Sequence, residues 1–439
     1  MRLQLANPST HPRIATLPFA RRLDDWDLPD MHGVPGLHRH VVRLIELGDI
    51  SYVVKELPDD LAMREYRLLR ELAEDGLPTA EVVGVVTGKP DDDDGMLITR
   101  HLDYALPYRS LLSGRGLTIP YLGERLLDAL VGLLVRLHLA GFFWGDCSLS
   151  NTLFRRDAGR LSAYLVDTET GELYDELSSG QREMDVDLAI EKCAGELLDL
   201  QAAGILSPNA DPFELGEELR QRYHGLWAEL TSDEVFGDDE RFRIHERLRR
   251  INDLGYDVDE LELLQDEPGV TRMKLKTSVV EPGRYRRILR DLTGLDAQDH
   301  QARRLLNDVH NFGAWLQQKE GRPLPEAVIA HRWRERSFEP SLAAVPEELR
   351  GRRDPVEVFH EVLEYWHHWS AEEGADLDLP TAVSRYVDEV LTALPEERRI
   401  APAEGDVEVE DDLLEMDADT GPLDRDAVRE AAEADPRTT

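Results

Sequence analysis

The sequence predicts an α+β fold in which a small β-rich lobe with one helix precedes a mostly helical lobe, and a mostly helical C-terminal domain follows. Paired β-like runs occupy the first hundred residues, and long helical patterns begin near residue 107. A further helical section follows residue 265. The expected segments are an irregular N-terminal segment 1–34, a first domain 35–265, a helical domain 266–400 and a disordered acidic tail 401–439.

The β-rich lobe is predicted from alternation and turn signals. Two β-like runs are joined by Gly48-Asp49, which is typical of a hairpin. A helix rich in Leu, Arg and Glu follows, and Gly76 and Pro78 end it. The elements expected in this lobe are strands at 41–47, 50–57, 82–87 and 96–100 and a helix at 60–74.

The helical lobe is predicted from a long apolar helix and two short strands. The turn Asp157-Ala158-Gly159 separates these strands, and another long helix follows them. The elements expected here are helices at 121–141 and 184–202 and strands at 152–154 and 164–166. The C-terminal domain is expected to open with a strand at 271–280 and to continue as helices to about residue 396.

Charge and composition exclude several classes of function. The formal net charge is -38 and the sequence pI is about 4.7, which argues against a nucleic-acid binder and against docking on an anionic membrane. Asp128, Arg136 and His138 interrupt the longest apolar run, so we expect a core helix and no membrane span. Two cysteines, Cys147 and Cys193, and the absence of an apolar signal sequence favour a cytoplasmic location.

Lys55 ends an apolar strand, and Glu65 lies ten residues later in the following helix. Phosphate transfer from a nucleotide needs a lysine that holds phosphates and a carboxylate that holds the lysine. We interpret Lys55 and Glu65 as such a pair. Taken alone, two ordinary surface charges would be the simpler interpretation.

Asp146 and Asn151 lie five positions apart, after a long helix and before a short strand, and Asp167 closes the next strand. In this interpretation Asp146 orients or deprotonates an acceptor hydroxyl, and Asn151 and Asp167 supply oxygen ligands to Mg²⁺. Turn chemistry alone also favours Asn and Asp at such positions. The combination of helix, Asp-x4-Asn, strand and closing Asp is much more specific than any one part.

The run at 142–151, FFWGDCSLSN, resembles the catalytic loop of the protein-kinase-like superfamily. Its Gly145-Asp146 step makes it similar to the aminoglycoside phosphotransferase and lipopolysaccharide kinase branches. The resemblance covers about 35–265 and implies a bilobal kinase-like fold that uses ATP and Mg²⁺. It implies catalytic roles for Asp146, Lys55 and Glu65, metal ligation by Asn151 and Asp167, and nucleotide contacts from Lys55, Arg39, Arg100 and Leu102.

The whole chain is also similar to actinobacterial kinase-like proteins in which a phosphotransferase-like half precedes a C-terminal domain of unknown function. The stretches 39–43, RHVVR, 302–308, ARRLLND, and 359–361, FHE, carry this resemblance. It implies no particular acceptor. A protein partner that binds through the C-terminal domain is compatible with it.

Three departures from the kinase pattern keep an inactive pseudokinase in consideration. The expected nucleotide loop lacks a glycine-rich signature and reads His38-Arg39-His40, which could either contact phosphates or block the site. Trp144 stands where kinases usually have His. Thr168-Glu169 follows Asp167, and Glu169 could add a ligand oxygen or face solvent.

Other charged residues have weaker interpretations. Asp187, near the start of a helix, could anchor the catalytic-loop backbone or simply favour that helix start. His360, Glu364 and His368 share a helix face that could hold a metal, although a packing helix is the simpler interpretation. A basic segment could bind an anionic ligand or the acidic tail, or be a solvated face; its residues are Lys274, Lys276, Arg284, Arg286 and Arg287.

These expectations combine into one functional hypothesis with one rival. The leading hypothesis is an ATP- and Mg²⁺-dependent phosphotransferase that acts on a hydroxyl of a small-molecule or glycan-like acceptor. The rival is a nucleotide-binding pseudokinase that regulates its C-terminal domain or a partner protein.

Overall fold

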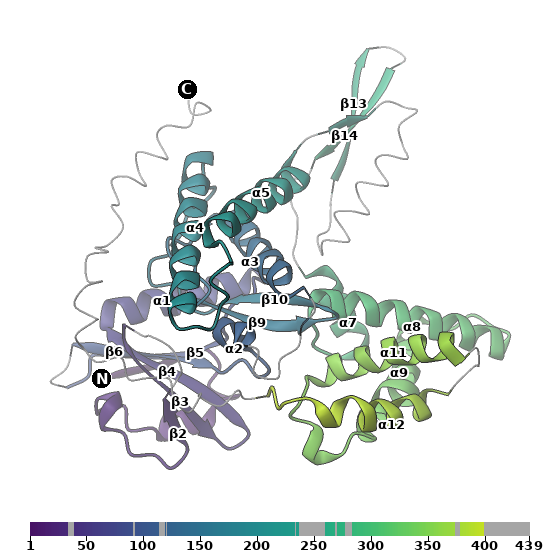
Figure 1. The fold of residues 1–439 in the computed structure, drawn as a ribbon, viewed down its shortest axis with the longest axis horizontal. Coiled ribbons are helices and arrows are strands. Elements are labelled where there is room, and N and C mark those ends of the chain that lie inside the picture. The colour runs from purple at the N-terminus through teal and green to yellow at the C-terminus, as the bar shows by residue number, and fades with distance from the viewer. Residues whose placement is uncertain are drawn as a thin grey trace.

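The computed structural model describes residues 1–33, 39–90, 93–113, 119, 121–232, 234–236, 260–267, 270–276, 283–373 and 378–398 (Figure 1). Its elements follow the predicted order of β-rich lobe, helical lobe and helical C-terminal domain, so the predicted fold class is confirmed. The expected acidic tail, 401–439, lies outside the described residues, as does His38 of the expected nucleotide loop.

Six antiparallel strands form the sheet of the N-terminal lobe, in the order β1-β5-β6-β4-β3-β2. Gly48 takes a φ of +73° in the predicted hairpin turn, where Leu47 pairs with Ile50. Helix α1 covers one face of the sheet, and its Tyr66 packs in one cluster with Leu97 of β6. The bounds are β1 Arg2–Leu5, β2 Met31–Gly33, β3 Val41–Leu47, β4 Ile50–Pro58, α1 Asp59–Glu74, β5 Val82–Thr87 and β6 Asp94–Arg100.

The N-terminal segment, expected to be irregular, is part of this lobe. Its strand β1 pairs with β5, and β2 pairs with β3. Between these strands, Ile14, Leu23 and Trp26 are buried on the sheet face opposite α1. Prolines do interrupt the segment, but the apolar residues between them reach the sheet and complete the core of the lobe.

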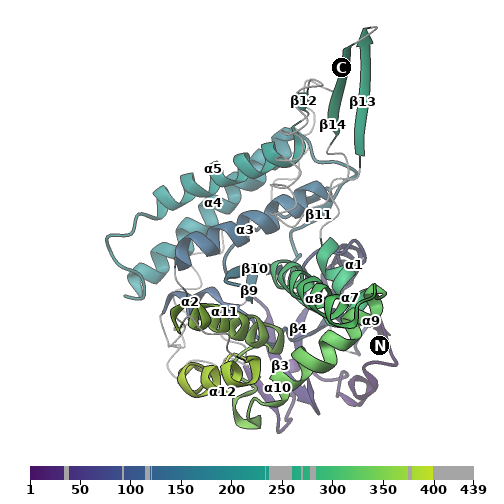
Figure 2. The same ribbon diagram turned by 90° about the vertical axis from the view of Figure 1, so that its right-hand side faces the viewer.

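The helical lobe is built from α3, α4 and α5, which lie side by side (Figure 2). Helix α3 also packs against the β9-β10 hairpin. Ser178 and Gln181 form a capping box, so α4 begins at Ser179 instead of the predicted residue 184. The bounds are β7 Leu106–Pro107, α2 Tyr108–Leu112, α3 Leu122–Leu139, β8 Phe142–Phe143, β9 Thr152–Asp157, β10 Arg160–Leu165, β11 Glu172–Leu173, α4 Ser179–Ala202 and α5 Pro212–Thr231.

Helix α3 is the core helix predicted from the longest apolar run. Leu130, Leu134 and Leu137 are buried in the main core of the helical lobe. Its polar interruptions have partners: Arg136 pairs with Asp299, and the buried His138 bonds Asp185 and Tyr223. Among the helices that the structure describes, none is both long and apolar enough to cross a membrane.

The C-terminal domain is mostly helical, as predicted. Strands β12, β13 and β14 form a small sheet that projects from the rest (Figure 1). The domain boundary was expected near residue 265, but strand β13 continues across this position and pairs with β14. The helices enclose one core around Trp333 and Phe359 and another around Val383 and Tyr386. The bounds are β12 Glu234–Phe236, β13 Glu260–Glu267, β14 Val270–Lys276, α7 Arg284–Thr293, α8 Asp299–Glu320, α9 Glu326–Trp333, α10 Glu339–Ala343, α11 Pro355–Glu373 and α12 Leu379–Glu389.

The tip of the β9-β10 hairpin attaches the helical lobe to the C-terminal helices. Asp157 accepts a hydrogen bond from the Gln301 N–H at 2.8 Å and so caps the start of α8. Arg156 donates from two nitrogens to Glu397, at 3.0 Å from Nε and 2.9 Å from Nη2. Further contacts join Arg155 with Asp354, Tyr164 with Gln298, and Arg136 with Asp299. The C-terminal domain thus fixes the hairpin that leads from the loop at 142–151 to Asp167.

We expect His300, which lies at this junction, to make the free energy of unfolding depend on pH. Burial, then the charges of Arg160, Arg136 and Arg303, lower its pKa to about 4, and Asp299 opposes them. The unfolded chain, with a histidine pKa of about 6.5, binds more protons between pH 4 and 6.5. Stability is therefore expected to fall as the pH drops through that window, by about 3 kcal/mol from this group.

Urea unfolding of the wild type and of His300→Gln at pH 4.5 and 7 measures this contribution. The variant should lose the His300 part of the pH slope. The comparison cancels the opposite contribution of Asp157, whose pKa burial raises to about 6 with help from the Asp299 charge. Identical slopes in both proteins would contradict the expectation.

Candidate active site

Lys55 lies between two carboxylates. Its Nζ is 3.2 Å from Glu65 Oε2 and 2.7 Å from Asp167 Oδ2. Strand β4 and helix α1 bring Lys55 to Glu65, and the segment after β10 brings Asp167 to both. Glu65 Oε1 also accepts a hydrogen bond from the Thr168 N–H at 3.1 Å. Glu65 therefore holds both the lysine and the chain that follows Asp167.

Burial and charge fix the ionisation of this cluster. Burial alone would lower the pKa of Lys55, but the charges of Asp167 and Glu65 outweigh it and raise that pKa above its usual value. Burial raises the pKa of Glu65, the charge of Asp167 acts in the same direction and Lys55 opposes both. For Asp167, Lys55 outweighs burial and lowers the pKa. At neutral pH the site thus presents a lysine cation and an ionised Asp167.

The loop at 142–151, the candidate catalytic loop, brings Asp146 and Asn151 together. The side-chain nitrogen of Asn151 donates to the main-chain oxygen of Asp146 at 3.1 Å and to its Oδ2 at 2.9 Å. Because the amide nitrogen is used in this way, the amide oxygen is the atom that could bind a cation. The main-chain carbonyl of Asn151 accepts a hydrogen bond from the Val166 N–H at 3.3 Å. Asn151 therefore lies across the hairpin from Val166, the residue before Asp167.

Lys192 of α4 reaches the same loop, and sequence reasoning missed it. Its Nζ is 3.4 Å from Asp146 Oδ1, and both side chains are partly exposed. Only six lysines occur in the sequence, against 45 arginines, and two of them, Lys55 and Lys192, contact the candidate aspartates.

Helix α4 also holds the backbone of the loop at two points. Asp185, fully buried, accepts from the N–H groups of Trp144 at 2.7 Å and Gly145 at 2.8 Å. Glu196 accepts from the N–H groups of Leu149 and Ser150, at 2.7 and 2.9 Å. Spacings of seven and four residues place Asp185, Lys192 and Glu196 on one helical face, a signal that the sequence contained.

The predicted anchor Asp187 does not hold the loop. Its side chain points to Arg220 of α5 and forms an ion pair at 2.8 Å. Asp185, two residues earlier, takes the anchoring role instead. Two residues along a helix turn a side chain to a different face, so only one of the two aspartates can reach the loop.

Trp144 lies in the core and does not fill the site. Its side chain is buried, and its Nε1 donates to the main-chain oxygen of Asp167 at 3.2 Å. The Thr170 hydroxyl donates to the main-chain oxygen of Trp144 at 2.9 Å. The residue that replaces the usual kinase histidine therefore ties the catalytic loop to the segment that carries Asp167.

Glu169 connects the expected nucleotide loop to the lysine. His40 Nε2 lies 3.1 Å from Glu169 Oε2, Arg39 Nη1 lies 3.5 Å from Glu169 Oε1, and Lys55 Nζ lies 3.6 Å from Glu169 Oε2. The hydrogen bond with His40 is the first cause of a lowered Glu169 pKa. Arg39 and His40 therefore reach the site, but here they bind a carboxylate of the protein itself.

The expected hinge follows β6. The Arg100 N–H donates to the Glu81 carbonyl at 2.8 Å, and the Arg100 side chain pairs with Glu81. The Leu102 carbonyl accepts from the Ala105 N–H at 3.1 Å. The Arg100 N–H and the Leu102 carbonyl are thus already hydrogen-bonded within the chain. An adenine base could pair only with the other backbone groups of residues 100–102.

No three His, Cys, Asp or Glu side chains in the described part of the chain gather closely enough to hold a metal ion on their own. In nucleotide sites, Mg²⁺ is often bound by side-chain oxygens of an Asp and an Asn, and phosphate oxygens complete its coordination shell. Asn151 and Asp167 could offer such side-chain oxygens. In the C-terminal domain, Arg304 contacts both His360 and Glu364, so an arginine occupies the helix face that could have held a metal.

The fold and this site define a protein-kinase-like domain. Residues 38–189 match the model of the lipopolysaccharide kinase (Kdo/WaaP) family, and residues 225–391 match the model of a domain of unknown function, DUF4032. The chain therefore matches a lipopolysaccharide kinase model in its N-terminal half and the DUF4032 model in its C-terminal half, which confirms the resemblance proposed from the sequence. The candidate site residues Lys55, Asp146 and Asp167 lie within the first match.

Comparisons with solved structures and with curated proteins do not extend this assignment. The solved structure titled "WaaP in complex with acyl carrier protein" is 18% identical to this chain and has a TM-score of 0.37; the similarity covers 58% of this chain and 99% of that chain. A similarity of this size supports no further argument. A comparison with curated proteins gives no match.

Proposed function

We propose that this protein is an ATP- and Mg²⁺-dependent phosphotransferase that acts on a hydroxyl of a small-molecule or glycan-like acceptor. The observation that carries the proposal is Lys55, held 3.2 Å from Glu65 and 2.7 Å from Asp167 in a domain of the lipopolysaccharide kinase family. A lysine fixed between a helix carboxylate and a metal-binding carboxylate is what phosphate positioning requires.

Each residue of the site has a role in this proposal. ATP with Mg²⁺ supplies the transferable phosphate and neutralises its charge. Lys55 binds phosphate oxygens, and Asn151 and Asp167 offer oxygens to the metal. Asp146 accepts the proton of the acceptor hydroxyl, and Lys192, 3.4 Å from it, balances negative charge that builds up on the phosphate.

The cytoplasm is the location we propose. Both cysteines, Cys147 and Cys193, are free and buried, which is compatible with a reducing compartment where ATP is available. The glycan-like acceptor is proposed because the kinase-like domain matches a family that is described by its action on lipopolysaccharide.

A pseudokinase is the second candidate, and one observation favours it. His40 and Arg39 bind Glu169 beside Lys55, where phosphates would lie. If those contacts persist when nucleotide is present, they would oppose a catalytic geometry. The domain would then regulate the C-terminal helices or a partner protein through the β9-β10 hairpin.

Turnover separates the two candidates. We expect the wild type to consume ATP in the presence of Mg²⁺ and a panel of sugar and polyol acceptors, and Asp167→Ala to lose at least 100-fold in rate, an estimate from the charge that the metal ligands hold in place. Nucleotide binding without turnover across the panel would support the pseudokinase and reject the enzyme.

A further inference from the structure

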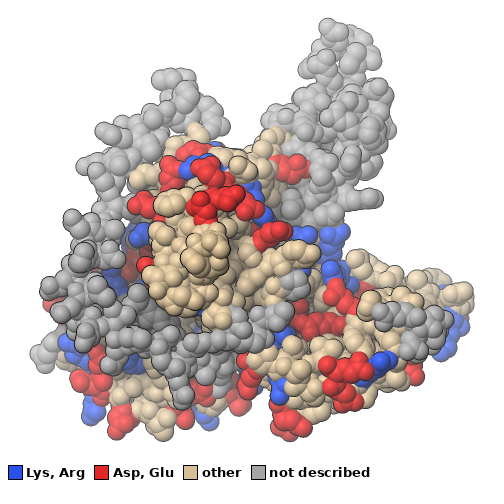
Figure 3. Space-filling view, viewed as in Figure 1, with Lys and Arg blue, Asp and Glu red and all other residues tan. Residues whose placement is uncertain are grey.

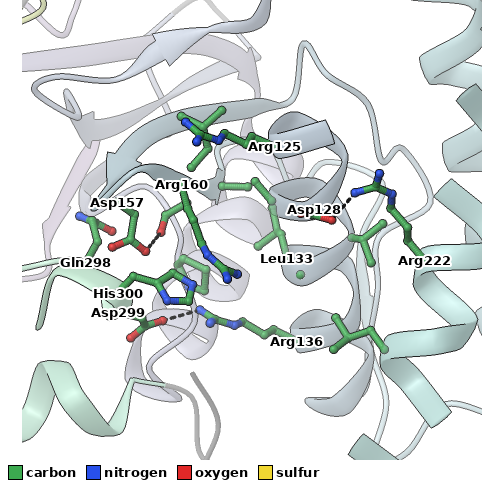
Figure 4. Close-up of a pocket in the computed structure, with 18 of the residues that line it drawn as sticks. Arg125, Asp128, Leu133, Arg136, Asp157, Arg160, Arg222, Gln298, Asp299 and His300 are labelled. Carbon is green, nitrogen blue, oxygen red and sulfur yellow. Dashed lines mark hydrogen bonds and ion pairs between the residues drawn. The ribbon is translucent and has the colours of Figure 1, made fainter. Parts of the chain in front are cut away.

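A cavity of about 400 Å³ lies where the helical lobe meets the C-terminal helices (Figure 4). Its walls come from α3, the β9-β10 hairpin, α5, α7 and the start of α8. The described lining includes neither Lys55 nor Asp146 nor Asp167, so the cavity is separate from the candidate active site. Its volume lies in the range of small-molecule sites, which often lie between domains.

Five arginines and four carboxylates line this cavity, so its lining carries a small excess of positive charge although the chain is acidic. Arginines line it from four elements, and they are Arg125, Arg136, Arg160, Arg222 and Arg286. Arg222 pairs with Asp128, and Arg136 pairs with Asp299 at 2.9 Å. Among the described residues, Arg125 and Arg160 have no carboxylate within ion-pair distance. In Figure 3, blue side chains also gather at the junction of the helical lobe and the C-terminal helices.

The charges converge at one end of the cavity. Figure 4 shows the Arg160 and Arg136 side chains extending toward His300. Burial and then the charges of these arginines keep the His300 imidazole neutral at physiological pH, with Arg303 acting in the same direction and Asp299 opposing. The surroundings of His300 at this end of the cavity are therefore desolvated and positively charged. Guanidinium groups with a neutral imidazole form a donor set that suits a phosphate.

The remaining wall is apolar. Val131 and Leu133 of α3, Leu161 of β10 and Leu226 of α5 line the cavity beside the arginines. An inorganic ion would leave these side chains without a partner, whereas a compact organic group attached to the anion would cover them. The ligand that fits both halves is a small phosphate monoester with an apolar body.

We propose that this cavity is a second ligand site, distinct from the candidate active site, which binds a small phosphate monoester with an apolar group. Arg160 and Arg136 of the helical lobe and His300 of the C-terminal domain hold the phosphate, and the α3 and α5 side chains cover the apolar group. The ligand therefore contacts both domains and stabilises their docked arrangement, because it binds only when they are together.

Titration calorimetry of the full chain with 1-naphthyl phosphate tests the proposal, with inorganic phosphate and 1-naphthol as the two separate halves. We expect 1-naphthyl phosphate to bind at least tenfold more tightly than either half. Arg160→Gln should weaken it at least tenfold, and Arg160→Lys by less, because the charge remains. The exposed Arg67→Gln on α1 makes the same charge change elsewhere and should leave binding unchanged.

Two further measurements keep the result unambiguous. Lys55→Met should bind 1-naphthyl phosphate as the wild type does, because the candidate active site is not involved. If Arg160→Gln shows a lowered melting temperature, His300→Gln replaces it. The proposal is overturned if the wild type does not bind, if inorganic phosphate binds equally well, if the cavity variants bind normally, or if Lys55→Met abolishes binding.

Discussion

Replacing Asp146 by Asn is expected to lower the rate of phosphate transfer by a factor on the order of 10²–10⁴ while nucleotide binding is retained. The substitution keeps the size of the side chain and still lets it accept a hydrogen bond from Asn151, which lies 2.9 Å from its Oδ2. It removes the carboxylate that would take the proton of the acceptor. Steady-state rates with saturating ATP, Mg²⁺ and the best acceptor of the panel measure the loss.

Asp187→Asn is the matched control for this change. Asp187 lies on α4, two residues after Asp185, but its side chain is exposed and pairs with Arg220. It should leave the rate within twofold of the wild type, as expected for a surface ion pair (roughly, from). An unaffected rate in Asp146→Asn would show that the loop does not act as a catalytic loop.

Replacing Asp185 by Ala should destabilise the protein by about 3–5 kcal/mol, the cost of leaving buried polar groups without their charged partner. Its carboxylate is fully buried and accepts hydrogen bonds from the N–H groups of Trp144 and Gly145 and bonds His138 at 3.0 Å. Urea unfolding followed by tryptophan fluorescence measures the loss, since Trp144 is in the affected loop.

The same helix offers the control. Asp187→Ala removes an exposed ion pair and should cost less than about 1 kcal/mol. Equal losses in the two variants would mean that the loop is not held by Asp185. A loss in the Asp185 variant with normal hydrogen exchange at Trp144 and Gly145 would also contradict the anchoring role.

The local parts of this site could be predicted from the sequence, because their residues are close along the chain. Asp146 and Asn151 share one loop, and Lys55 and Glu65 lie on a strand and the helix that directly follows it. Turn residues and alternation also gave the β3-β4 and β9-β10 hairpins, which depend on nearby residues.

The contacts between distant segments could not be predicted. Lys192 and Asp185 reach the loop at 142–151 only because α4 packs beside it. Their spacing shows that they share a helical face, but not what that face contacts. Strand β1 joins the sheet through β5, a pairing that no local pattern signals. The attachment of the β9-β10 hairpin to α8 likewise depends on tertiary packing, as Asp157 and Gln301 are far apart in sequence.

Titration calorimetry of the wild type and of Asp167→Ala with ATP, with and without Mg²⁺, tests the central claim most directly. That claim is that Lys55, Glu65 and Asp167 form the phosphate and metal end of a nucleotide site. It predicts that the wild type binds ATP more tightly with Mg²⁺ than without, and that Asp167→Ala loses this dependence on Mg²⁺. An absence of ATP binding by the wild type, or binding that neither Mg²⁺ nor the Asp167 substitution changes, would contradict it.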